Sequence, residues 1–232
     1  MLKYRSYTKE LLDGDNIPEK DLFLNLKELD TINKLLGGYN ISLSALNKII
    51  QPNESYRLVD IGCGGGDTLK HIYTWTERSK KNIALVGIDI KPVCIEYATE
   101  NTKDLPIEYI CDDYRQLYKH TEKVDIIHAC LFCHHLDEAQ LVELVSFALK
   151  HKAILVINDL ERNPIAYYSI KWLTGLFSKS YLVKNDAPLS VARGFKKNEW
   201  TSILLKAGAT DFTVKNKWAF RHEIVVYGNK SE

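Results

Sequence analysis

The sequence has few of the features that would place a protein in a membrane or on a nucleic acid. No stretch approaches the apolar length of a membrane span, and the N-terminus has no apolar leader segment, so we expect neither membrane insertion nor secretion. The net charge is only +1 and there is no long basic block, which argues against a nucleic-acid partner. The five cysteines are an odd number and are scattered, so we expect a reducing, cytoplasmic setting rather than a disulfide framework.

Two common phosphate-binding motifs are also missing. The glycine turn that starts at Gly62 has Asp67 where a dinucleotide-binding G-x-G-x-x-G pattern needs its last glycine. No glycine-rich loop of the chain ends in Lys-Ser or Lys-Thr. The sequence therefore matches neither fingerprint, although its 232 residues are enough for one α/β domain with a sizeable core.

The most informative segment is an apolar run followed by alternate glycines, Leu58-Val59-Asp60-Ile61-Gly62-Cys63-Gly64-Gly65-Gly66-Asp67. Such a turn lets the backbone approach a ligand closely, because glycine has no Cβ. The flanking Asp60 and Asp67 suit a ligand with an ammonium group better than one with a pyrophosphate. A second apolar strand pattern, residues 82–90, ends in Asp89 and Ile90. An acidic residue about 20 residues beyond the turn is where α/β nucleotide sites bind ribose hydroxyls.

Two further strand patterns follow in the chain. The first is Ile107-Glu108-Tyr109-Ile110-Cys111-Asp112-Asp113-Tyr114, and the second is Val124-Asp125-Ile126-Ile127, followed by His134-His135-Leu136. In order and spacing, the four segments resemble the motifs of the class I S-adenosylmethionine (SAM)-dependent methyltransferases, from about Leu58 to the C-terminus.

This resemblance implies SAM as cofactor and S-adenosylhomocysteine (SAH) as product. It also implies an Asp at the adenine amino group, where Asp113 fits better than Asp112. The candidate cofactor-binding residues are Asp60, Gly62, Cys63, Gly64, Asp67, Asp89, Ile90, Asp112, Asp113 and Tyr114.

Strand and helix patterns alternate along most of the chain, which predicts an α/β fold with a Rossmann-like, doubly wound and mostly parallel sheet. The predicted strands are residues 57–61, 83–90, 107–111, 124–129 and 153–157, and the predicted helices are 68–79, one from Pro92, 138–150 and 199–207. The last two strands, 212–217 and 223–227, are separated by only five residues. A parallel crossover needs a dozen or more residues, so we expect an antiparallel final strand.

Two segments fall outside this alternation. We expect residues 1–56 to form an N-terminal helical cap and residues 57–232 to form the methyltransferase domain, with a cap insert at 160–195. The insert is rich in aromatic residues and leaves from a strand end, where ligands bind in open α/β sheets. We predict that it covers the substrate, with Tyr168 or Trp172 near the sulfur end of the cofactor. The alternative is an extra helix whose aromatic residues fill its own core.

The candidate catalytic residues follow the fourth and fifth strands. His134 and His135 can take a phenolic or enolic proton near neutral pH, or orient the acceptor. Alternatively, one of them packs under the loop or caps the next helix. Asp159 is a further candidate, or it caps the turn into the insert. The Cys130-x-x-Cys133 pair superficially suggests zinc, but it begins in a predicted buried strand whose alternate residues diverge, so we expect no metal.

The sequence thus predicts methyl transfer to a small acceptor, at oxygen or carbon. Residues 158–162 and 186–191 resemble segments of bacterial quinone- and polyketide-tailoring methyltransferases, which implies an aromatic or lipidic metabolite. One alternative is a non-catalytic binding or accessory protein with this fold, and another is a protein or RNA methyltransferase. The amide-methylating signature N-P-P-Y is missing, since the corresponding strand end reads Ala129-Cys130-Leu131-Phe132. The expected assembly is a monomer or homodimer.

Overall fold

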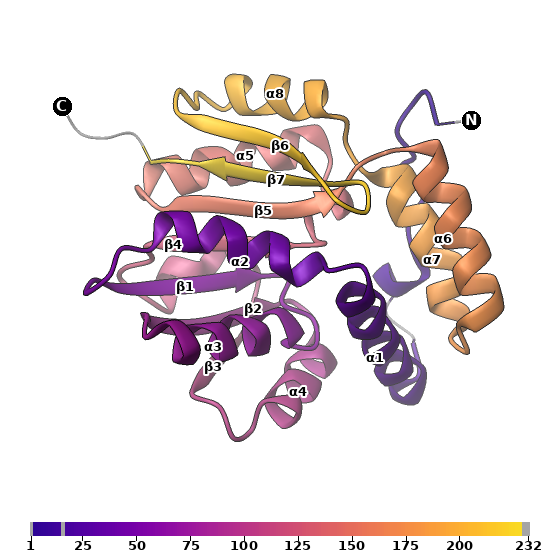
Figure 1. The fold of residues 1–232 in the computed structure, drawn as a ribbon, viewed down its shortest axis with the longest axis horizontal. Coiled ribbons are helices and arrows are strands. Elements are labelled where there is room, and N and C mark those ends of the chain that lie inside the picture. The colour runs from indigo at the N-terminus through magenta and orange to yellow at the C-terminus, as the bar shows by residue number, and fades with distance from the viewer. Residues whose placement is uncertain (1, 15–16, 229–232) are drawn as a thin grey trace.

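A computed structural model describes residues 2–14 and 17–228 (Figure 1). Its centre is a seven-stranded sheet in the order β3-β2-β1-β4-β5-β7-β6. The strands are β1 Ser55–Ile61, β2 Asn82–Asp89, β3 Ile107–Cys111, β4 Ile126–Cys130, β5 Ile154–Leu160, β6 Phe212–Lys217 and β7 Arg221–Val226. Strands β1 to β5 pair in parallel, and β7 is antiparallel to both of its neighbours. The predicted fold class is confirmed.

Helices cover both faces of the sheet, because neighbouring strand residues point to opposite sides. Val59 packs in a core with residues of α5 (Glu138–Lys150) and α8 (Lys197–Lys206). Its neighbour Leu58 packs in a second core with residues of α2 (Gly38–Ile49) and α3 (Asp67–Ser79). Helix α4 (Pro92–Asn101) contacts β2 and β3. Among the helices of the described chain, none has both the length and the apolar character that a bilayer crossing requires.

Three helices lie beyond the carboxyl ends of the parallel strands, at the end of the sheet toward which β5 points (Figure 1). They are α1 (Glu19–Leu35), α6 (Pro164–Phe177) and α7 (Tyr181–Arg193). Glu28 of α1 accepts a 2.8 Å hydrogen bond from the backbone N–H of Lys179, which ties α1 to the α6–α7 connection. The division of the chain into residues 1–56 and 57–232 stays a prediction, and α2 contacts both α1 and the strands β5 and β7 of the sheet.

Three short 3₁₀ helices complete the description: η1 (Leu11–Asp13), η2 (Tyr114–Lys119) and η3 (Cys133–His135). The first follows the extended N-terminal segment and packs against α7, whereas η3 contacts β5 and α7. The fold therefore brings the N-terminal segment, the loop after β4 and the insert to one end of the sheet.

Candidate active site

A cavity of about 440 Å³ lies at the carboxyl ends of β1 to β4, beside α1. Small-molecule sites commonly have this size, and open α/β sheets bind ligands at this edge. Nine of the ten predicted cofactor-binding residues line it: Gly62, Cys63, Gly64, Asp67, Asp89, Ile90, Asp112, Asp113 and Tyr114.

The glycine turn after β1 forms part of the cavity wall. Gly64 has a φ of 51°, in the left-handed region that favours glycine. A Cβ added there would meet only Leu26, at 3.8 Å, so a larger side chain would extend into the cavity. The N–H of Gly64 donates a 3.0 Å hydrogen bond to Asp89 Oδ2, and the N–H of Lys91 donates one of 2.9 Å to Oδ1. Burial raises the pKa of Asp89, although these two bonds oppose the shift.

A second cavity, of about 570 Å³, lies between α1, α6, α7 and the turn that joins β6 to β7. Much of its wall is apolar: Leu29, Ile32, Leu36, Ala166, Ile170, Leu173, Val191 and Phe220. Four residues line both cavities, namely Leu12, Leu29, Leu131 and His135. The two cavities therefore adjoin along this shared wall. Leu131 has a φ of 54°, which is unusual for a bulky residue.

The loop after β4 places His134 against the end of β5. The backbone N–H of His134 donates to Asp159 Oδ2 at 2.9 Å, and ring atom Nδ1 lies 2.7 Å from Oδ1. Burial alone would raise the pKa of Asp159, but the charge and hydrogen bond of His134 hold it below its ordinary value. Because a carboxylate only accepts hydrogen bonds, Nδ1 carries the hydrogen and Nε2 is left to face the second cavity. Two of the predicted catalytic residues are thus in direct contact.

His135 has a matching partner in the N-terminal segment. Its Nδ1 atom lies 3.0 Å from Asp13 Oδ1, and Asp13 Oδ2 accepts a 2.8 Å bond from Arg193. Burial would raise the pKa of Asp13, but the hydrogen bonds from His135 and Arg193 hold it well below its usual range. A carboxylate therefore holds the ring of His135 at its Nδ1 atom, as Asp159 holds the ring of His134.

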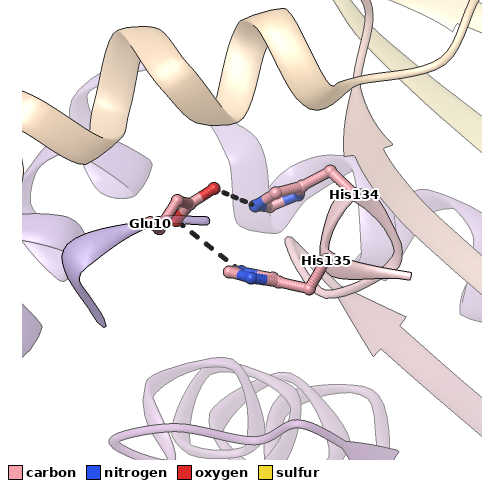
Figure 2. Close-up of side chains that lie close together, drawn as sticks. All are labelled: Glu10, His134 and His135. Atoms are coloured by element: carbon pink, nitrogen blue, oxygen red, sulfur yellow. Dashed lines mark ion pairs between the residues drawn. The ribbon is translucent and has the colours of Figure 1, made fainter. Parts of the chain in front are cut away.

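Glu10 completes this cluster, and Figure 2 shows its carboxylate facing both imidazoles. Its Oε1 atom is 3.7 Å from His134 Nε2, and its Oε2 atom is 3.9 Å from His135 Nε2. Burial raises the pKa of Glu10, against the charge of His135 and a 2.9 Å hydrogen bond from Ser190. These three side chains have the donor atoms and the proximity to hold a metal ion.

Comparison with known families identifies the central part of the chain. Residues 58–151, which include the glycine turn, Asp89 and the loop after β4, match the family model described as a methyltransferase domain. Residues 58–151 are a class I methyltransferase domain. The predicted family is confirmed, and SAM is the cofactor of this family, as predicted.

Solved structures share the methyltransferase fold over most of the chain. The plantazolicin methyltransferase BpumL, crystallised with a triazolic desmethylPZN analogue and SAH, superposes with a TM-score of 0.65 over 90% of this chain and 91% of its own, at 16% identity. The CMeT domain of the citrinin polyketide synthase superposes with a TM-score of 0.56 over 78% of this chain and 48% of its own, at 15% identity. At these identities the likeness shows the fold.

One similar curated protein is the carboxy-S-adenosyl-L-methionine synthase of Actinobacillus pleuropneumoniae serotype 3 (strain JL03). It is 23% identical over 137 residues, which make up 56% of this chain and 56% of that protein. The chain thus matches about half the length of this relative.

The side chains after β3 lie at another part of the methyltransferase cavity. Asp112 Oδ2 is 2.7 Å from His120 Nε2, and Asp113 is paired with Arg115 at 2.5 Å. Hydrogen bonding to these partners lowers the pKa of both carboxylates. Tyr114 lines the same wall and meets Phe132 edge-on, so acidic and aromatic groups stand together here.

The methyltransferase structure does not bring Asp60 to the cavity. The buried Asp60 carboxylate lies 2.6 Å from His128 Nδ1, and His128 Nε2 lies 2.9 Å from Ser42 Oγ on α2. Strand alternation explains the difference, because Asp60 points toward the face that α2 covers. Asp60 is therefore not among the residues that line this cavity, and its contact with the cofactor stays a prediction.

Tyr168 and Trp172 also lie elsewhere than predicted. They are 55% and 64% exposed and line neither cavity. Residues four and seven positions after Ala166, which are Ile170 and Leu173, share its face of α6 and line the second cavity. The methyltransferase insert thus borders this cavity with its aliphatic face, while these two aromatic residues turn outward.

Sequence reasoning missed Glu10 and Asp13, because they precede every strand motif and no spacing links them to the histidines. The Cys130-x-x-Cys133 pair takes no part in the cluster. Cys133 is fully buried, and burial raises the pKa of its thiol well above the ordinary value.

Proposed function

We propose that this chain transfers a methyl group from SAM to an oxygen of a small apolar molecule, aromatic or lipidic, that binds in the second cavity. The observation that carries this proposal is the shared wall of the two cavities at Leu12, Leu29, Leu131 and His135. A methyl transfer needs donor and acceptor in line and in contact, shielded from water. Two adjoining cavities, one beside the glycine turn and one apolar, supply that arrangement.

The residues of the first cavity suit SAM. SAM supplies an activated methyl group on a sulfonium. Asp89 is assigned to the ribose hydroxyls, since each of its oxygens keeps a lone pair beyond its bond to a backbone N–H. The open side of Gly64 faces the methionine part, and Asp67 its ammonium group. The acidic pair after β3, Asp112 and Asp113, is assigned to the adenine.

The acceptor class follows from the walls of the second cavity. The walls that α1, α6 and α7 contribute carry many aliphatic side chains. Apolar walls favour an acceptor whose own apolar surface is removed from water on binding. BpumL was crystallised with an azolic analogue, which agrees with an acceptor that is a small molecule.

Glu10, His134 and His135 line the second cavity, and His135 also lines the first. A hydroxyl acceptor has to give up its proton for the transfer. His134 and His135, fixed through Nδ1 by Asp159 and Asp13, are the groups that promote this loss. Asp159 acts through His134, as an orienting residue rather than as a base. The cytoplasm is the proposed compartment, which agrees with five free cysteines.

The direct test is transfer from SAM carrying a deuterated methyl group. The tag-free protein is incubated with labelled SAM and fractions of a bacterial metabolite extract, and mass spectrometry follows SAH and labelled products. We expect one labelled apolar product formed in step with SAH, and a fall in turnover of about 10²-fold for His134→Gln or His135→Gln with SAH affinity retained. The control is Asp89→Ala, for which we expect weakened cofactor binding.

Two other outcomes would redirect the assignment. A labelled protein or RNA would move the acceptor to another class. A new derivative of SAM itself, without SAH, would favour the chemistry named for the Actinobacillus relative, a carboxy-S-adenosyl-L-methionine synthase.

A further inference from the structure

Three side chains from two segments converge at the wall of the second cavity (Figure 2). Glu10 comes from the segment before η1, and His134 and His135 come from η3. One donor atom from each lies within 4.8 Å of the other two. Glu10 and His134 are buried, and His135 is half-buried, so the cluster is largely screened from solvent.

The far nitrogen of each ring is already committed to a carboxylate. His134 Nδ1 lies 2.7 Å from Asp159, and His135 Nδ1 lies 3.0 Å from Asp13. Each Nδ1 therefore donates, and a neutral ring held in this way presents its Nε2 lone pair to the cluster. In metal sites a ligating histidine almost always donates its other N–H in this way, often to a carboxylate. Here both histidines have that outer partner.

The distances within the cluster are also those of ligands to a common ion. Glu10 Oε1 is 3.7 Å from His134 Nε2 and Glu10 Oε2 is 3.9 Å from His135 Nε2, and both separations exceed a hydrogen bond. Two ligands at about 2.0–2.2 Å from one ion stand about 3–4 Å apart at ordinary coordination angles. Small side-chain adjustments would therefore place all three donors on one ion.

The charges that contact the cluster favour a cation. The carboxylates are those of Glu10, Asp13, Asp159 and Asp186, and the guanidinium groups are those of Arg5 and Arg193. Arg193 Nη1 forms its shorter ion pair with Asp13 Oδ2, at 2.8 Å, and lies 3.8 Å from Glu10 Oε1. If both imidazoles are neutral, the four carboxylates outnumber the two guanidinium groups by two, and this net negative charge around the cluster attracts a cation.

We propose that Glu10, His134 and His135 bind one divalent first-row transition-metal ion, such as Zn²⁺, with coordination positions open toward the acceptor. Two imidazoles and one carboxylate form a recurrent ligand set for catalytic zinc and for non-haem iron. This ligand set differs from the cysteine pair that the sequence suggested, and it departs from our expectation of no metal.

The role of the ion, though not its binding, rests on the proposed function. An acceptor hydroxyl on an open position would lose its proton to water more easily, because the ion stabilises the oxyanion. In the transfer, the oxygen gives a lone pair to the methyl carbon. The carbon–sulfur bond breaks, and its electron pair stays on sulfur. The histidines would then act as ligands, and the ion rather than an imidazole would promote loss of the proton.

The test is metal binding by tag-free protein that has been stripped with a chelator. Calorimetry with Zn²⁺ and the visible spectrum with Co²⁺ should show one ion per chain. Glu10→Gln and His135→Gln should weaken binding by at least about tenfold. The control is His120→Gln, which alters an exposed histidine outside the cluster. Thermal unfolding confirms that each variant is folded, and Glu10→Gln keeps the shape of the side chain.

Sub-stoichiometric binding, or binding that both variants keep unchanged, would overturn the site. SAH affinity measured on the same samples separates the two proposals. Protein that binds SAH but no ion refutes the metal site and leaves the methyl transfer standing. Protein that binds the ion but not SAH refutes the methyl transfer and leaves the metal site standing.

Discussion

Replacement of Asp89 by alanine tests the cofactor assignment at its most specific point. The carboxylate stands at the end of β2 and accepts bonds of 3.0 Å from Gly64 and 2.9 Å from Lys91. Its remaining lone pairs are the proposed acceptors for the ribose hydroxyls. Loss of charged hydrogen bonds costs about 1–3 kcal/mol of binding free energy. The dissociation constant for SAH should therefore rise by about 5- to 150-fold.

Isothermal titration calorimetry with SAH at neutral pH measures this change directly. The control is Asp104→Ala, which removes an exposed carboxylate near α4. Alanine at position 89 also leaves the N–H groups of Gly64 and Lys91 without their acceptor, so thermal unfolding is followed for both variants. An SAH affinity within about twofold of wild type in folded Asp89→Ala would refute the assignment of Asp89 to the ribose, because the loss of a charged hydrogen bond should weaken binding by more than this.

Three further perturbations test other parts of the site. Gly64→Val adds about 1–2 kcal/mol of backbone strain and extends into the cavity, so SAH binding should be lost. The control is Gly175→Val, whose added Cβ meets nothing within 4 Å, and undiminished binding by folded Gly64→Val would contradict the prediction. Burial, with the charge of Asp30, raises the pKa of Asp67 to about 6. Because the cationic amine of SAH favours ionised Asp67, affinity should fall about tenfold between pH 7 and pH 5. Asp67→Asn should remove that slope, and an unchanged slope would argue against the contact. Ala187→Phe fills the second cavity, so methyl transfer should fall by about tenfold or more with SAH affinity kept, and full turnover would place the acceptor elsewhere.

Most of the fold could be predicted from local patterns. Alternation of apolar strands with helical segments gives a parallel sheet, and the short link between β6 and β7 requires an antiparallel pair. The range of β3 was predicted correctly as residues 107–111, whereas β5 runs to Leu160, three residues past its predicted end. Strand ends of this kind depend on pairing partners, here β7, which local sequence does not reveal.

The cofactor side of the site was also accessible from sequence, since its residues follow strands whose carboxyl ends meet at one edge. The acceptor side of the site was less accessible from the sequence. The phase of α6 decides that Ile170 rather than Trp172 faces the cavity, and packing against α7 sets this phase. Glu10 and Asp13 reach the histidines only because the N-terminal segment crosses the strand ends. That crossing is a tertiary contact with no local signal.

A crystal structure of the SAH complex would test the account most directly. We predict that the ribose lies at Asp89 and that the sulfur atom lies at the wall shared by the two cavities, within reach of Leu131 and His135 and facing the apolar cavity. SAH bound with its sulfur turned away from the second cavity, or bound outside the cavity beside the glycine turn, would contradict the proposed path of the methyl group.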